Sequence, residues 1–275
     1  MADLKASEAP TQKRRDAVFE LSQTIATWDA AYYDPIALPF YDLAIARMIS
    51  AMGVPPGAKV LDAGCGPGEH TIRVARLGRR VRAIDISEAM LQEARSRVAK
   101  AGLSHMVEFD RQDLTQLDLP DHSFRYVFSW GVVIHIRDID KALHELARVV
   151  EPGGFLALWV SNTAAVDYLV ERIARRLLRK PLDGLMSCDE GDGISYRFEG
   201  ENLWVWRVDP RWLVRTLVAR GFQLRRRLMG TFTETHTRVR GLPRKLLLRF
   251  NNVALRLGGP VSISATNLFV FQKKT

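Results

Sequence analysis

The stretch VLDAGCGPG at residues 60–68 decides the fold. Its first half continues a short apolar run that begins at Lys59, and the run ends at Gly64, which is typical of a buried strand followed by a tight turn. Residues 69–77 are then predicted to form a helix. Glycine lets the backbone approach a ligand closely, so this strand, loop and helix predict a ligand site where the strand ends.

Strands and helices continue to alternate on the C-terminal side of this loop. Ser87 is the expected N-cap of one helix and Gly102 its stop signal. Strands separated by helices imply a parallel sheet with helices on both faces. The predicted strands are 80–86, 106–109, 124–130 and 155–160, the predicted helices are 87–101 and 140–150, and Pro152-Gly153-Gly154 is a predicted turn.

Three acidic residues follow successive strands, where ligands bind in sheets of this kind. Asp62 closes the first strand, Asp85 closes the second, and Asp113 follows the third. Asp85 can accept hydrogen bonds from both hydroxyls of a ribose, and Asp113 from an exocyclic amine. Glu69 begins the helix after the glycine loop and would compete with a pyrophosphate there, which favours a nucleoside without phosphates.

These residues resemble the class I S-adenosylmethionine (SAM)-dependent methyltransferases of the small-molecule group. The resemblance covers about residues 54–161, in four blocks that occur in the expected order. The blocks are VLDAGCGPG (60–68), AIDISEAMLQEAR (83–95), FDRQDLTQLDLPDHSF (109–124) and ALHELARVVEPGGFLAL (142–158). It implies an α/β fold: a Rossmann-like, seven-stranded, mostly parallel sheet with helices on both faces, an antiparallel last strand and helical lid insertions.

The resemblance also implies a SAM site. Gly64 and Gly66 would pass under the methionine moiety, and Asp62 would organise its amino group. Asp85 would take the ribose hydroxyls and Asp113 the adenine amine. The remaining implied cofactor neighbours are Cys65, Ile86, Met90, Leu114, Ser129 and Trp130. One departure is Arg125, where many relatives have Asp.

The family fold predicts the end of the chain as well. A helix is expected at 209–220, a sixth strand at 223–228, and an antiparallel last strand at 267–272. Two segments are then insertions, at about 162–206 and 231–262, where substrate choice usually resides. The predicted domains are an N-terminal helical cap over 1–53 and a methyltransferase domain over 54–275.

A hydroxyl acceptor benefits from a general base, and His135 is the best-placed candidate, five residues after Trp130. The alternative is that His135 only caps a loop or helix, and His70 is expected to pack rather than to act as a base. Trp28, Tyr32 and Tyr33 either close over SAM or pack an N-terminal helix. Trp204, Trp206 and Trp212 are expected in the core, and no spacing of ligands predicts a metal.

Charge divides the chain. Residues 1–160 hold 19 Lys and Arg against 21 Asp and Glu, whereas residues 161–275 hold 21 against 10. Two basic amphipathic segments, 167–180 and 242–257, are either lid helices or contacts with an anionic membrane surface. Nucleic acid is not expected as a partner, because residues 129–132 (SWGV) lack the Asn/Asp-Pro-Pro-aromatic turn that holds a base amine.

Composition excludes other classes. Hydrophobic residues make up 47% and charged residues 26%, which rules out disorder, collagen and coiled coil as the main theme. Two cysteines fit a reducing compartment. No apolar run is long enough to span a membrane, and residues 1–16 are not expected to form a secretory signal. A cytoplasmic protein is expected, with peripheral attachment to the inner membrane surface as the alternative.

The sequence thus predicts a cytoplasmic SAM-dependent methyltransferase of small-molecule biosynthesis. Its acceptor would be a small molecule or lipid-like, methylated at oxygen, and methylation at nitrogen or carbon stays open. An RNA or protein methyltransferase and a non-catalytic SAM-binding membrane-surface protein are the alternatives, and a nicotinamide oxidoreductase is disfavoured by the glycine spacing. The acceptor and the oligomeric state are not predicted.

Overall fold

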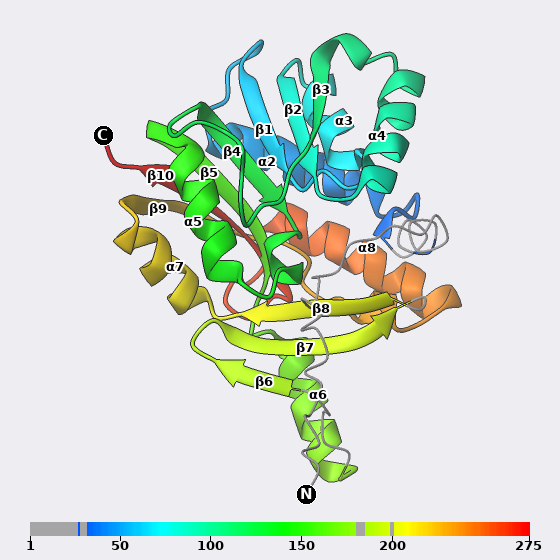
Figure 1. Cartoon of the computed structure of the whole chain (residues 1–275). Coiled ribbons are helices and arrows are strands. Elements are labelled where there is room, and N and C mark those ends of the chain that lie inside the picture. The colour runs from blue at the N-terminus through cyan, green and yellow to red at the C-terminus, as the bar shows by residue number, and fades with distance from the viewer. Residues whose placement is uncertain (1–26, 28–31, 180–184, 199–200) are drawn as a thin grey trace, which may run out of the picture.

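The computed structural model describes residue 27 and residues 32–179, 185–198 and 201–275. A seven-stranded sheet with the strand order β3-β2-β1-β4-β5-β10-β9 forms its centre (Figure 1). The first five strands of the chain are parallel, and β10 is antiparallel to both of its neighbours. The strands are β1 (Lys59–Ala63), β2 (Arg80–Asp85), β3 (Val107–Arg111), β4 (Phe124–Trp130), β5 (Val150–Ser161), β9 (Phe222–Met229) and β10 (Thr266–Lys273).

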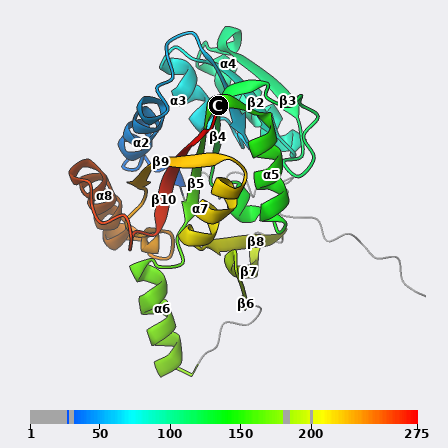
Figure 2. The ribbon, with the colours of Figure 1, turned by 90° about the vertical axis from the view of Figure 1, so that its left-hand side faces the viewer.

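Helices cover both faces of the sheet, as the sequence predicts (Figures 1 and 2). One face packs against α5 (Ile139–Val149) and α7 (Pro210–Ala219), whose apolar residues share one buried cluster with β4 and β5. The other face carries a second cluster. Its helices are α2 (Leu38–Ala51), α3 (Glu69–Arg76), α4 (Glu88–Lys100) and α8 (Gly241–Leu257).

The termini of α4 form where the sequence places them. The Ser87 hydroxyl accepts a hydrogen bond from the Met90 N–H at 3.2 Å, which satisfies one free amide of the first turn. Gly102 follows the helix with a φ of 72°, a left-handed conformation that favours glycine. These short-range signals are confirmed.

The structure differs from the prediction at residues 152–154. The predicted turn lies inside β5, which begins at Val150. Val150 lies opposite Phe124 and Phe155 lies opposite Tyr126, so the intervening residues form an irregularity in the strand. Gly153 has a φ of 74°, which lets the chain absorb the extra residues without leaving the sheet.

The first insertion is not purely helical, which corrects the prediction of helical lids there. It begins with α6 (Val166–Leu177) and continues with β6 (Leu185–Cys188), β7 (Gly191–Phe198) and β8 (Glu201–Val208), which form a separate three-stranded antiparallel sheet. The Trp204 ring occupies the space beside Gly193, because a Cβ there would lie 2.1 Å from that ring. The second insertion contains the short helix η3 (Thr235–Thr237) and α8.

The buried core tests one further prediction. Trp204, Trp206 and Trp212 are buried, so their assignment to the core is confirmed. In α2, Ile45 and Met48 are fully buried in the same cluster as β1 and β10. The predicted boundary at residue 53 stays a prediction, and Trp28 lies outside the described residues. No helix in the described ranges is long and apolar enough to cross a bilayer.

Candidate active site

The glycine loop after β1 is held by Asp85. The Gly66 N–H donates a hydrogen bond of 2.8 Å to one Asp85 carboxylate oxygen, and the Ser87 N–H donates one of 3.0 Å to the other. Gly64 has a φ of 87°, and a Cβ on it would lie 2.4 Å from the side chain of Val132. A Cβ on Gly66 would meet no atom within 4 Å, so the space beside it is open to a ligand.

Two carboxyls beside this loop have raised pKa values. Asp62 is 1% exposed and accepts a hydrogen bond of 2.6 Å from the Thr71 hydroxyl. Burial raises the pKa of Asp62 to about 7, and the neighbouring Asp85 charge adds to this. Burial also raises the pKa of Asp85, although the backbone N–H groups of Ser87 and Gly66 oppose it.

Among the other residues predicted around the cofactor, Ile86 follows β2 and Asp113 and Leu114 follow β3, whereas Cys65 lies in the loop after β1 and Met90 in α4. Asp113 is exposed, and one of its carboxylate oxygens accepts hydrogen bonds of 2.8 Å from the N–H and hydroxyl of Thr115. Ile86 is 36% exposed, an open apolar surface beside Asp85. Cys65, Met90 and Leu114 are buried.

Aromatic rings gather where β4 ends. The Trp130 ring stacks on Trp159 with centroids 4.0 Å apart and lies 4.7 Å from the His70 ring. The Tyr33 ring lies 5.9 Å from His70. Within the described part of the chain, the buried Ser129 hydroxyl and His70 Nδ1 have no hydrogen-bond partner. Burial lowers the pKa of His70, with help from Arg73, so this ring is neutral.

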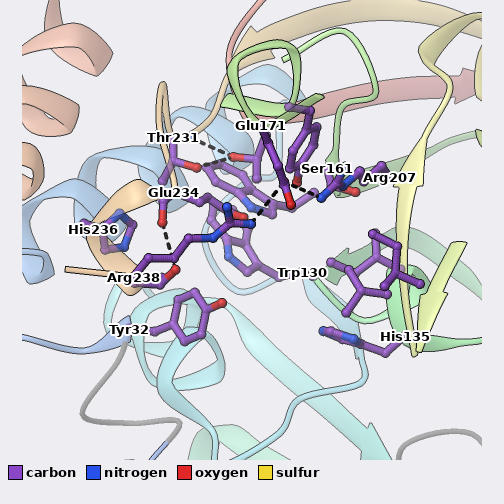
Figure 3. A pocket seen from close by; sticks show the side chains of 18 of the residues that line it. Tyr32, Trp130, His135, Ser161, Glu171, Arg207, Thr231, Glu234, His236 and Arg238 are labelled. Carbon is purple, nitrogen blue, oxygen red and sulfur yellow. Dashed lines mark hydrogen bonds and ion pairs between the residues drawn. The ribbon is translucent and has the colours of Figure 1, made fainter. Parts of the chain in front are cut away.

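A cavity of about 450 Å³ opens from these rings (Figure 3). Its walls come from the β4–α5 loop, β5, α6, the small sheet and the loop after β9. Tyr33, Trp130 and His135, all predicted from the sequence, line it together. The cavity therefore joins the aromatic end of the predicted cofactor site to both insertions.

His135 is fixed in one orientation. Its Nδ1 lies 2.9 Å from the Trp204 carbonyl oxygen, which only accepts, so Nδ1 carries the proton and Nε2 the lone pair. The neighbouring Ile136 carbonyl accepts a hydrogen bond of 2.8 Å from the Trp206 indole. Burial lowers the pKa of His135, which keeps the imidazole neutral. Strand β8 thus holds the loop that carries this ring.

The far end of the cavity is charged. The Glu171 carboxylate lies 2.9 Å from Arg175, 2.7 Å from Arg207 and 3.4 Å from Arg238. Burial alone raises the pKa of Glu171, but the guanidinium groups, led by Arg207, outweigh it and lower the pKa overall. The Arg207 guanidinium also lies 3.9 Å from the centre of the Tyr168 ring. One carboxylate therefore organises three cations.

Glu234 differs from Glu171 in the same cavity. Among the described residues, no hydrogen bond or ion pair joins its carboxyl to another side chain. Burial and the charge of Asp167 raise the pKa of Glu234 to about 7. Its loop is nevertheless held firmly, because Asp167 accepts a hydrogen bond of 2.7 Å from the Glu234 N–H and Asn251 bonds both backbone groups of Thr233.

Comparison with known proteins assigns the chain to a family. Residues 60–154 match a family model described as a methyltransferase domain. The ubiquinone/menaquinone biosynthesis C-methyltransferase UbiE of Hahella chejuensis is 30% identical over 199 residues, which cover 71% of this chain and 80% of UbiE. The chain belongs to the SAM-dependent methyltransferases.

Other proteins match this chain over different shares of their length. The methyltransferase GfsG of Streptomyces halstedii is 38% identical over 113 residues, and the match covers 41% of each chain. The chain thus spans less than half the length of GfsG. The magnesium protoporphyrin IX methyltransferase of Synechocystis PCC 6803, solved with bound SAH, has a TM-score of 0.61 at 18% identity and covers 92% of this chain and 95% of its own. That likeness confirms the fold.

The residues of this methyltransferase fit SAM. The open space beside Gly66 admits a ligand to the backbone, and the buried Ser129 hydroxyl and His70 Nδ1 provide unpaired polar atoms near Trp130. Carboxylates at the ends of β1 and β2 suit the ammonium and ribose groups. In the described ranges, no group of three or more His, Cys, Asp or Glu side chains could hold a metal ion.

Sequence reasoning missed the charged end of the cavity. Glu171, Arg207, Glu234 and Arg238 come from α6, β8 and the loop around η3, and no local motif links them. The only local signal was the spacing of Glu171 and Arg175, which are four residues apart in one helix. That pattern is common on solvated helices and does not predict a cavity.

Proposed function

We propose that this protein transfers the methyl group of SAM to an oxygen atom of a small or lipid-like acceptor held in the 450 Å³ cavity. The observation that carries the proposal is His135, a neutral imidazole in the cavity wall with Nδ1 on the Trp204 carbonyl. A neutral imidazole oriented by its second nitrogen is a suitable general base for a hydroxyl.

The proposed cofactor residues are those that surround the glycine loop. Asp85 would bind the ribose hydroxyls while it holds Gly66, and Asp62 would orient the amino group. Asp113 would accept from the adenine amine. The proposed neighbours are Tyr33, Gly64, Cys65, Ile86, Met90, Leu114, Ser129 and Trp130.

In the proposed reaction, SAM supplies an electrophilic methyl group on its sulfonium. The chain's own contribution is alignment and proton removal. Trp130 and the rings around it exclude water and limit where the acceptor can lie. His135 accepts the proton of the acceptor hydroxyl at Nε2, and the Trp204 carbonyl stabilises the imidazolium that results.

The acceptor proposed for the cavity has an apolar body and one polar group. Trp159, Ile194 and Val205 offer apolar walls, and Glu234 and Arg238 offer polar partners at one end. Named relatives include UbiE and a 27-O-demethylrifamycin SV methyltransferase.

The test uses methyl-labelled SAM and an extract from the protein's own source. Label is expected in the lipid or small-molecule fraction, whereas label only in RNA or protein would overturn the acceptor class. His135→Ala should lower turnover roughly 10²–10⁴-fold. The matched control is His105→Ala, which removes an exposed imidazole and should leave turnover unchanged.

The pH dependence separates a base from a structural histidine. Because burial lowers the pKa of His135, wild-type turnover should persist below the pH at which an ordinary histidine protonates, and then fall. His135→Ala should remove this acidic limb. An unchanged profile, or an equal loss of SAM affinity by calorimetry, would contradict the role of base.

A further inference from the structure

Helix α6 exposes an apolar stripe. Leu169, Ile173 and Leu177 are spaced four residues apart, so they lie on one side of the helix, and all three are exposed, Leu177 to 78%. Tyr168 is the one buried residue that α6 contributes to the body. Figure 2 shows α6 projecting from the body of the molecule. A helix with this surface needs a partner or an apolar environment.

Helix α8 repeats the arrangement. Its inward side carries Leu248, Asn251 and Leu255, which are buried. Its outward side exposes five large apolar residues at helical spacing, of which the last is 81% exposed. They are Leu242, Leu246, Phe250, Val253 and Leu257. Both helices lie on the same side of the view in Figure 2.

Exposed cations accompany both stripes. Within the described residues, none of these cations forms an ion pair with a carboxylate. They are Arg172, Arg176 and Arg179 near α6, and Lys245, Arg249 and Arg256 on α8. Apolar side chains flanked by Arg and Lys characterise helices that lie in the plane of an anionic lipid surface.

A groove lies along α6 beside the cavity. Val170, Ala174 and Leu178 line the groove on the helix side, and Thr235 lines it from η3. Glu171, Arg175 and Arg238 line both the groove and the cavity. The helix that exposes the apolar stripe therefore also contributes to the wall of the proposed acceptor site.

We propose that the exposed stripes of α6 and α8 dock this protein on an anionic lipid bilayer and bring the groove to the bilayer surface. The apolar side chains would enter the headgroup region, and the flanking arginines and lysines would lie against lipid phosphates. The docking is argued from α6 and α8 alone. That an acceptor resident in the bilayer reaches the cavity by way of the groove rests on the proposed function as well.

A bilayer fits these stripes better than a second copy of the chain. Residues 161–275 contain 21 Lys and Arg against 10 Asp and Glu, and pairing two such surfaces would bring like charges together. An anionic lipid surface supplies the opposite charge along both helices.

The docking is tested by flotation of the purified full-length chain with vesicles at low salt. We expect the chain to float with mixed phosphatidylcholine–phosphatidylglycerol vesicles, and to float much less with phosphatidylcholine alone or at high salt. Leu177→Glu and Leu257→Glu should each weaken vesicle binding about tenfold, because each places a carboxylate in the stripe. Val218→Glu, on the 47% exposed Val218 of α7, is the matched control and should bind as the wild type does.

Three outcomes would overturn the docking. The first is failure of the wild type to float at low salt. The second is equal flotation of Leu177→Glu and the wild type. The third is a dimer in sedimentation velocity that Leu177→Glu or Leu257→Glu dissociates, which would make the stripe an interface between copies. Calorimetry of the same variants with SAM should show unchanged affinity. Absence of label in every extract fraction would instead count against the proposed function and leave the flotation result standing.

Discussion

Residues 54–161 and residues 162–275 build their halves of the site in different ways. In the first half, Asp85 is held by the N–H groups of Ser87 and Gly66, two and 19 residues away. In the second, Glu171 is held by the side chains of Arg207 and Arg238, 36 and 67 residues away. The first half relies on backbone geometry within one βα unit, and the second on side chains that meet only after the insertions fold.

This difference has a physical consequence. Hydrogen bonds from the backbone N–H groups of a glycine loop need the loop's own conformation, so few replacements of the loop residues preserve them. These hydrogen bonds depend little on the rest of the molecule. A cluster of side chains depends on every element that contributes one. Substitutions in residues 54–161 should therefore change backbone strain and the affinity for SAM. Substitutions in residues 162–275 should change the free energy of unfolding by disrupting ion pairs.

The largest effect is expected for Gly64→Ala. Its Cβ would collide with the side chain of Val132, and the φ of 87° disfavours any residue with a Cβ. We expect a loss of about 3–5 kcal/mol in the free energy of unfolding, measured by urea denaturation. Gly57→Ala is the control, since Gly57 has a φ of 78° but no atom within 4 Å, and it should cost about 1–2 kcal/mol. Equal losses would show that Val132 does not constrain the loop.

Arg207→Met tests the charge cluster. The Arg207 and Glu171 side chains are 7% and 9% exposed, so removal of the guanidinium leaves a buried carboxylate with weaker partners. A loss of about 2–4 kcal/mol in the free energy of unfolding is expected. Arg238→Met removes a cation that is 60% exposed and 3.4 Å from Glu171, and should cost less than about 1 kcal/mol. A larger loss for Arg238→Met than for Arg207→Met would show that the exposed ion pair contributes more stability than the buried one.

Asp85→Ala tests the cofactor half. Loss of charge-assisted hydrogen bonds should weaken SAM binding by about 1.5–3 kcal/mol in calorimetry. Asp118→Ala removes an exposed carboxylate from the same half and should leave SAM affinity unchanged. If Asp85→Ala binds SAM as the wild type does, the ribose lies elsewhere.

Glu234→Gln should give the smallest effect, and one that depends on pH. The pKa of Glu234 is about 7 in the folded chain and near 4.5 when unfolded, so ionisation of the folded form costs stability as the pH rises through this interval. The pKa difference corresponds to at most about 3.4 kcal/mol. Because Glu234 is only partly buried, the variant should be about 1–2 kcal/mol more stable than the wild type at pH 8 and equal at pH 4, measured by thermal unfolding. Glu171→Gln should do the reverse, because the pKa of Glu171 is lowered and its ionised form contributes stability above its unfolded pKa. If the stability of both variants relative to the wild type changes with pH in the same direction, the opposite pKa shifts of Glu234 and Glu171 are contradicted.

The two halves also differ in how far the sequence predicts them. β1, α4 with its caps, and β10 lie close to their predicted positions, because each is marked by local signals such as an apolar run, Ser87 or Gly102. The approach of Tyr33, Trp130 and His135 to one cavity follows from the family fold that these signals indicate.

The small sheet and the charged cluster were not predictable in the same way. The β7–β8 hairpin of the small sheet pairs Gly193 with Trp206, and the Trp204 ring fills the space beside Gly193. The spacing of apolar residues in the sequence does not indicate these contacts. Glu234 owes its raised pKa to burial and Asp167, which belongs to α6. Tertiary packing creates these features, so the sequence alone offers no signal for them.

The position of β10 has a consequence for the order in which the chain can fold. Strand β9 is joined to the sheet only through β10, which lies between β5 and β9. As the ribosome releases the chain, β9 must wait without a strand partner until Thr266–Lys273 emerges, while the edge of β5 stays open. Until then both edges can pair with other nascent chains, so the emergence of β10 is the step that closes this side of the sheet.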